Sequence, residues 1–260
     1  MTKKHDIIWL ESADSTNKEA QRHISAIDNL SVVSAIEQTA GRGQRGNTWE
    51  SQPGMNLLFS VVLKFSGKNH EEGMLPQIDA IDQFVISEAA ALSVVDLLAE
   101  NGIEAKIKWP NDIYVGDRKI CGMLIENSLK GHSLSSSIVG IGLNVNQKVF
   151  SPSLPNPTSM HLEDGGTYDI RQLLERFMDI FRLYIDRYCN PHGGYAVLRK
   201  LYQSQMWRKG TDSCFKDMTS IPEETFTGQI HGLTEIGHLL IKDKKGELRE
   251  FSFKEISYII

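Results

Sequence analysis

Residues 56–65 read Asn56-Leu57-Leu58-Phe59-Ser60-Val61-Val62-Leu63-Lys64-Phe65 and are almost continuously apolar. A short apolar run of this kind predicts a β-strand buried on both faces. Residues 76–100 then place apolar side chains at spacings of three and four, which predicts a long helix, and Gly102 stands just past its end. Together these segments predict an α+β domain in which a mixed β-sheet is flanked by helices.

The pattern changes after Lys209-Gly210, where only short strand-like segments follow. We expect strands at residues 226–230, 238–241, 247–251 and 256–259. Short strands joined by tight turns are typical of a small β-barrel. The sequence therefore predicts two domains, residues 1–210 and residues 212–260.

Composition narrows the class of protein. The 260 residues are 40% hydrophobic and 23% charged, which is ordinary for a globular chain and excludes a disordered one. The net charge of −5 argues against a general polyanion binder driven by bulk charge. Three widely spaced cysteines give no zinc-binding pattern, and no apolar run is long enough to cross a membrane. We expect a soluble, cytoplasmic protein.

A long loop rich in glycine follows the predicted strand at residues 32–36. It contains Gln38-Thr39-Ala40-Gly41-Arg42-Gly43-Gln44-Arg45-Gly46-Asn47-Thr48-Trp49. Closely spaced glycines let backbone N–H groups point at an anion, and two arginines add fixed positive charge. Trp49 is suited to cover an apolar or purine face. The alternative is a flexible, solvated loop, since the segment matches neither a dinucleotide-binding nor a P-loop motif.

A second candidate is the segment 105–112, Ala105-Lys106-Ile107-Lys108-Trp109-Pro110-Asn111-Asp112. Its alternation places Lys106 and Lys108 on one face of a strand that ends at Pro110. A lysine held there can stabilise charge on a transferring phosphoryl or carboxylate oxygen. The alternative is the solvated face of an edge strand, with Asn111 and Asp112 as turn formers.

Two weaker candidates complete the set. Gly140 and Gly142 lie in a predicted strand that leads to Asn144, and strand glycines indicate close approach by another group or a bulge. Ser15-Thr16-Asn17 offers polar groups to a ligand. Thr16 and Glu19 also match a capping box, which explains them without any ligand.

In this order the motifs resemble those of biotin–protein ligase, in the form without an N-terminal DNA-binding domain. The likeness continues through residues 119–126, residues 156–160 and the C-terminal segment. It implies a sheet similar to that of class II synthetases and an SH3-like C-terminal barrel. It also implies a two-step reaction. Biotin attacks ATP to give biotinyl-5′-AMP, and a lysine of a biotin carboxyl carrier protein then accepts the biotinyl group.

The resemblance also implies roles for individual residues. Lys108 and Arg42 are expected to be catalytic. The residues expected at biotin are Ser15, Thr16, Asn17, Gln38, Arg42, Gly43, Gln44, Lys108 and Gly122. Those expected at the nucleotide are Arg45, Trp49, Asn111 and Asn144. ATP is the expected co-substrate with Mg²⁺, and no set of protein metal ligands is assigned.

One position departs from the family pattern. Gln44 stands where the bacterial repressor-type member has an arginine that helps retain the adenylate, so retention is expected to be weaker or to rest on Arg45. We expect no nucleic-acid or membrane partner, and either a monomer or a homodimer. Three other readings stay open: a lipoate or octanoate ligase, a nucleic-acid-binding module, and a non-catalytic biotin-binding protein.

Overall fold

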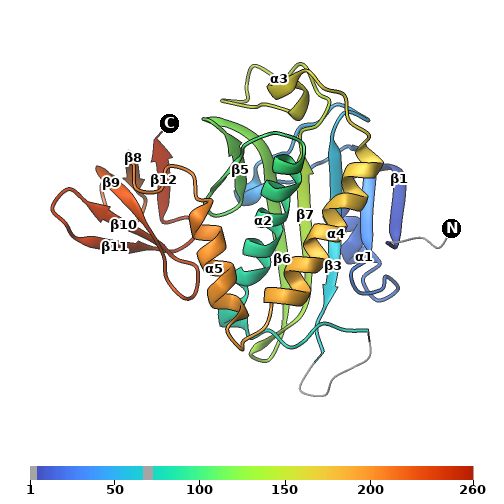
Figure 1. The fold of residues 1–260 in the computed structure, drawn as a ribbon, viewed down its shortest axis with the longest axis horizontal. Coiled ribbons are helices and arrows are strands. Elements are labelled where there is room, and N and C mark those ends of the chain that lie inside the picture. Colours follow the sequence, from blue (N-terminus) through green and yellow to red (C-terminus); the bar gives the residue numbers. More distant parts are fainter. Residues whose placement is uncertain (1–4, 67–72, 260) are drawn as a thin grey trace.

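A seven-stranded sheet forms the larger part of the molecule (Figure 1). The computed structural model describes residues 5–66 and 73–259, with the side chain of Arg45 outside this description. The strand order is β1-β2-β3-β7-β6-β5-β4. β1 and β2 are parallel and the other neighbours are antiparallel, so the predicted mixed sheet is confirmed. The strands are β1 (Ile7–Ala13), β2 (Val32–Gln38), β3 (Leu57–Lys64), β4 (Lys106–Lys108), β5 (Asp112–Val115), β6 (Arg118–Lys130) and β7 (Ser133–Leu143).

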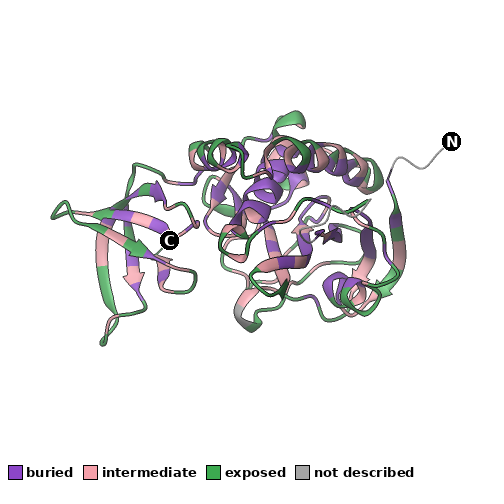
Figure 2. Cartoon of the chain, turned by 90° about the horizontal axis from the view of Figure 1, so that it is seen from below, coloured by how far each residue is buried: buried purple, intermediate pink, exposed green. Residues whose placement is uncertain are grey.

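The apolar run of residues 56–65 becomes β3, whose first seven residues are all buried. Helices cover both faces of the sheet. α2 (Phe84–Glu100) and α4 (Ile170–Tyr188) pack on one face, and α1 (Thr16–Arg22) packs on the other (Figure 1). Figure 2 shows the buried residues gathered between these layers. The site therefore rests on a well-filled core.

The long helix was expected from residue 76 but begins at Phe84. The preceding segment joins the end of the sheet instead. The backbone oxygen of Ile78 accepts a hydrogen bond from Leu134 N, and Asp79 forms a β-bridge with Ser133. A 3₁₀ turn (Ala80–Asp82) then leads into α2. Apolar spacing alone did not reveal this change of direction.

The C-terminal segment forms a five-stranded antiparallel sheet, consistent with an SH3-like domain. Its strands are β8 (Asp212–Asp217), β9 (Glu224–Leu233), β10 (Leu239–Asp243), β11 (Leu248–Phe251) and β12 (Ile256–Ile259). β8 was missed because two of its three buried positions are Ser213 and Asp217, which hide the alternation. We propose a domain boundary at 210–212, between α5 (Gly194–Ser204) and β8. The remaining helix is α3 (Met160–Asp164).

Aromatic and charged groups join the barrel to the larger sheet. Trp109 stacks on Phe253 with ring centroids 5.3 Å apart, and its Nε1 donates a hydrogen bond to Gly237 O at 3.0 Å. Arg199 of α5 pairs with the buried Glu88 of α2 and donates to Thr234 O at 2.6 Å. The turn after β4 is therefore tied to the barrel.

Replacing Trp109 with phenylalanine should destabilise the protein by about 1 kcal/mol. The stacked ring is kept, but the carbonyl of Gly237 loses its indole donor. Urea unfolding of the variant beside the wild type measures the change. Equal stability of the two proteins would contradict this account of the junction.

Candidate active site

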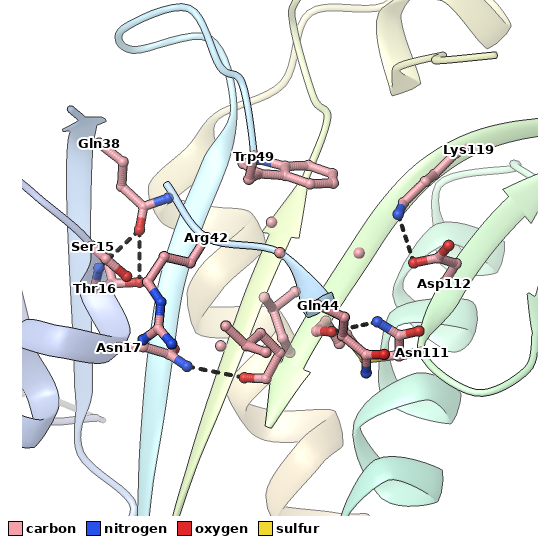
Figure 3. A pocket seen from close by; sticks show the side chains of 17 residues that line it. Ser15, Thr16, Asn17, Gln38, Arg42, Gln44, Trp49, Asn111, Asp112 and Lys119 are labelled. Atoms are coloured by element: carbon pink, nitrogen blue, oxygen red, sulfur yellow. Dashed lines mark hydrogen bonds and ion pairs between the residues drawn. The ribbon is translucent and has the colours of Figure 1, made fainter. Parts of the chain in front are cut away.

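A cavity opens between α1, the loop after β2 and the central strands (Figure 3). Its lining brings together most residues that the sequence singled out. They are Ser15, Thr16, Asn17, Gln38, Arg42, Gly43, Gln44, Trp49, Asn111 and Gly122. Asp112 and Lys119 also line it. We call this the first cavity.

Hydrogen bonds fix the polar wall of the first cavity. Gln38 Oε1 accepts from the backbone N–H of Thr16 at 2.8 Å and from Thr16 Oγ1 at 3.2 Å. Ser60 Oγ of β3 lies 2.8 Å from Thr16 Oγ1 and 2.6 Å from Asn17 Oδ1. The expected capping box is wrong, since Ser15 is the N-cap and the Glu19 amide donates to the Ser15 carbonyl. Thr16 instead orders the wall through Gln38 and Ser60.

The strand glycines make room for two side chains of the site. A Cβ atom on Gly140 would lie 2.0 Å from Asn17 Oδ1, and one on Gly142 would lie 2.5 Å from Trp49 Cε2. A Cβ on Gly122 would lie 2.9 Å from the same indole. The close approach expected at Gly140 and Gly142 is confirmed, and the approaching groups are Asn17 and Trp49.

Lys119 is the lysine that faces the first cavity. Its Nζ lies 2.6 Å from Asp112 Oδ1 and 5.6 Å from the centre of the Trp49 ring (Figure 3). The residue belongs to the segment 119–126 that shares the resemblance, but no role was predicted for it. Lys119 pairs with Tyr114 of β5, beside a register shift between Ile113 and Tyr114, and such a shift is not readable from the sequence.

Lys108 lies outside the first cavity, although it was expected to touch biotin. Its Nζ donates to Tyr114 Oη at 3.2 Å and lies 4.9 Å and 5.1 Å from the ring centres of Tyr114 and Tyr258. Burial lowers the pKa of Lys108 below its usual value. The hairpin of β4 and β5 turns this side chain toward β12 and away from Ser15 and Thr16. Lys108 instead lines a neighbouring cavity together with Gly43, Gln44 and Lys119, so it stays close to the loop of the predicted biotin site.

The loop after β2 is closed at its base. Trp49 N donates to Gly41 O at 3.0 Å, and Gly43 N donates to Asn47 O at 2.7 Å. The Arg42 guanidinium pairs with Glu126 of β6 at 3.1 Å. Gly43 and Gln44 reach the first cavity. Arg45 was expected at the nucleotide, but its side chain lies outside the part of the chain that the structure describes.

A second cavity of about 490 Å³ adjoins the first, and Trp49, Asp112 and Lys119 line both. Asn144 lines the second cavity and donates from Nδ2 to Thr158 O at 2.8 Å. Its buried Oδ1 has no hydrogen-bond partner among the described residues. Asn111 lines the first cavity instead, where its Nδ2 donates to Met123 O at 2.7 Å. Of the four residues expected at the nucleotide, Trp49 and Asn144 reach the second cavity.

Cation ligands are sparse at this site. Within residues 5–66 and 73–259, no group of three or more histidine, cysteine, aspartate or glutamate side chains is placed to hold a metal ion. Asp112 is the carboxylate at the junction of the two cavities.

None of the helices described is long and apolar enough to cross a membrane.

Comparison with known proteins agrees with this arrangement. Residues 9–144 match the model of the biotin/lipoate A/B protein ligase family. A biotin–[acetyl-CoA-carboxylase] ligase of Paracoccus denitrificans is 30% identical over 236 residues, 87% of this chain and 88% of that protein. The bifunctional ligase/repressor BirA of Bacillus spizizenii is 29% identical over 255 residues, 95% of this chain and 72% of that protein.

The fold is shared with a solved ligase. The biotin protein ligase from Aquifex aeolicus in complex with biotin and ATP superimposes with a TM-score of 0.77 and 27% identity, covering 98% of each chain. Sheet order, barrel and polar cavity thus define a ligase of the biotin and lipoate class. The chain belongs to the biotin/lipoate A/B protein ligase family, and within it to the biotin–protein ligases.

Proposed function

We propose that this protein activates biotin with ATP to biotinyl-5′-AMP and transfers the biotinyl group to one lysine of a biotin carboxyl carrier protein. The observation that carries the proposal is the junction of the two cavities, where Lys119, Asp112 and Trp49 line both. The homologues and solved structures that bind biotin and ATP support the substrates.

The polar wall suits the ureido ring of biotin. Ser15, Thr16 and Gln38 offer hydroxyl, amide and backbone groups at one end of the first cavity. The second cavity is large enough for a nucleoside and presents Trp49, Phe150 and Asn144. Biotin in the first cavity and adenosine in the second would meet beside Lys119.

In the first step a biotin carboxylate oxygen forms a bond to the α-phosphorus of ATP. The bond from that phosphorus to the oxygen bridging to the β-phosphate breaks, and pyrophosphate leaves with the electron pair. Two anions must be brought together, so a fixed cation is the main requirement. The 2.6 Å pair with Asp112 holds the Lys119 ammonium in place at the junction. We therefore assign to Lys119 the charge-stabilising role that the resemblance gave to Lys108.

In the second step the neutral amine of the carrier lysine attacks the acyl carbon. The bond from that carbon to the phosphate oxygen breaks, AMP leaves, and the amine loses a proton to give the amide. Trp49 packs over Gly122 and Gly142 and so shields the junction from solvent. Exclusion of water protects a reactive mixed anhydride from hydrolysis.

Mg²⁺ fits this site as a substrate-bound ion. It is usually held by one or two carboxylates together with substrate phosphates and water. Asp112 supplies a carboxylate at the place where the phosphates would lie. When bound, the ion would neutralise phosphate charge.

A third cavity of about 300 Å³ lies between the loop and the barrel, and Lys108 lines it. Lys108, Lys119 and Lys254 all line it, together with Tyr258 of β12. A cavity with three lysines beside the junction suits the β- and γ-phosphates. We propose that Lys108 binds the β- and γ-phosphates of bound ATP.

The remaining partners are proposed on charge and composition. The Paracoccus denitrificans relative, a biotin–[acetyl-CoA-carboxylase] ligase, supports a protein acceptor. A net charge of −5 gives no support to nucleic-acid binding. We propose action in the cytoplasm, as a monomer or a homodimer.

The acceptor is tested with a purified biotin carboxyl carrier domain. Incubation with this protein, biotin and ATP should attach one biotin, detected by intact-protein mass spectrometry. A carrier whose target lysine is replaced by arginine is the control and should stay unmodified. Adenylate formation without transfer to the carrier would reject the proposed acceptor and leave the first step intact.

A further inference from the structure

Glu126 of β6 carries a carboxylate that joins the cavity wall to the loop after β2. Its Oε1 lies 3.1 Å from Arg42 Nη2, and its Oε2 accepts from Arg42 Nη1 at 3.3 Å. The same Oε2 accepts from Asn17 Nδ2 at 2.8 Å. One carboxylate thus holds a bidentate guanidinium and a buried amide.

Arg42 stands at the base of the loop. It forms a β-bridge with Thr48, between the Gly41–Trp49 and Gly43–Asn47 hydrogen bonds. The direction in which the loop leaves β2 therefore depends on the group that the Arg42 side chain contacts. Because Gly43 and Gln44 line the first cavity, a change at Arg42 would displace them from the ligand.

Asn17 stands on the cavity wall and is 3% exposed. Its Oδ1 is fixed by Ser60, and its Nδ2 donates to Leu124 O at 3.1 Å as well as to Glu126. Loss of the carboxylate would leave this amide less well held. The cavity wall and the base of the loop are thus both held by the Glu126 side chain.

We propose that Glu126 is a positioning residue for biotin binding, and that Arg42 acts through Glu126 as an anchor of the loop. This inference rests on the proposed function. A guanidinium already engaged by both carboxylate oxygens has a defined partner within the protein. The pair is partly exposed, with side chains 40% and 37% accessible, so it should matter little for folding. Its effect is expected in substrate binding.

The test is Glu126→Gln in biotin-dependent exchange of pyrophosphate into ATP. The glutamine keeps the shape of the side chain and an oxygen for Asn17 but removes the charge that holds Arg42. We expect the KM for biotin to rise by about tenfold, with kcat changed by less than about twofold. The control is Glu100→Gln, which breaks a similarly exposed pair with Arg176 between α2 and α4 and should leave both constants unchanged.

The charge-swapped variant R42E/E126R separates an anchor from a catalytic arginine. We expect Arg42→Glu alone to raise the KM for biotin and the double variant to recover part of that loss, because an arginine at position 126 restores the ion pair but offers Asn17 Nδ2 no acceptor. A swapped enzyme as impaired as Arg42→Glu would overturn the inference, because a catalytic guanidinium cannot be supplied from β6. Kinetics of Glu126→Gln equal to those of Glu100→Gln, or a fall in kcat at constant KM, would also overturn it. Absence of exchange in the wild type would instead reject the proposed function.

Discussion

Replacing Lys119 with alanine is expected to lower kcat for biotin-dependent pyrophosphate exchange by about a hundred- to a thousandfold. Loss of one fixed donor aimed at developing charge typically has an effect of this size. The lysine lines both cavities, and its ammonium lies 2.6 Å from Asp112 at their junction. Steady-state exchange at saturating biotin and ATP measures the change.

Two matched variants make this result specific. Lys106→Ala removes a partly exposed lysine of β4 that bonds to Gln205, and it should leave exchange unchanged. Lys108→Ala should act mainly on the KM for ATP, since Lys108 lines the third cavity. A hundredfold loss of kcat in Lys108→Ala, with Lys119→Ala nearly normal, would restore the assignment made from sequence.

Replacing Gly140 with alanine is expected to abolish tight biotin binding and to destabilise the protein by about 2 kcal/mol. The new methyl group would lie 2.0 Å from Asn17 Oδ1, so the asparagine must leave Ser60 and Glu126. Displaced buried amide groups lose their hydrogen bonds at a cost of this order. The melting temperature should fall by about 4–8 °C, and calorimetric titration should show biotin affinity reduced by at least about thirtyfold.

The double variant N17A/G140A tests whether displacement of Asn17 causes the losses of stability and of biotin binding. Removing the amide makes room for the methyl group, so the melting temperature should recover in part while biotin binding stays weak, since Ser60 and Leu124 O still lack their bonds to Asn17. Recovery of neither property would mean that the strand, and not Asn17, meets the new methyl group. Recovery of both would mean that Asn17 has no part in the biotin site.

The order of secondary structure was largely predictable because burial repeats with a short period. β3 and the body of α2 follow from apolar spacing alone, and β9 to β12 match the four short strands expected after residue 210. β8 and the start of α2 were missed where buried polar residues or a β-bridge replaced the apolar pattern.

The site was predictable as a set of motifs but not as a geometry. Most of the expected biotin residues do line one cavity. The proposed choice of Lys119 over Lys108 rests on which lysine lines the first cavity, and the sequence pattern does not show that. The contact between Glu126 and Arg42 could not be predicted from the sequence, for a related reason. It lies 84 positions from Arg42 in the chain, and only the sheet order brings the two together.

Exchange of labelled pyrophosphate into ATP, measured with biotin, lipoate or octanoate as the acid, tests the proposed activity most directly. Biotin alone should support exchange, since the polar wall of Ser15, Thr16 and Gln38 suits a ureido ring. Exchange with lipoate or octanoate in place of biotin would contradict the substrate. Exchange with none of the three acids would contradict the adenylating reaction itself.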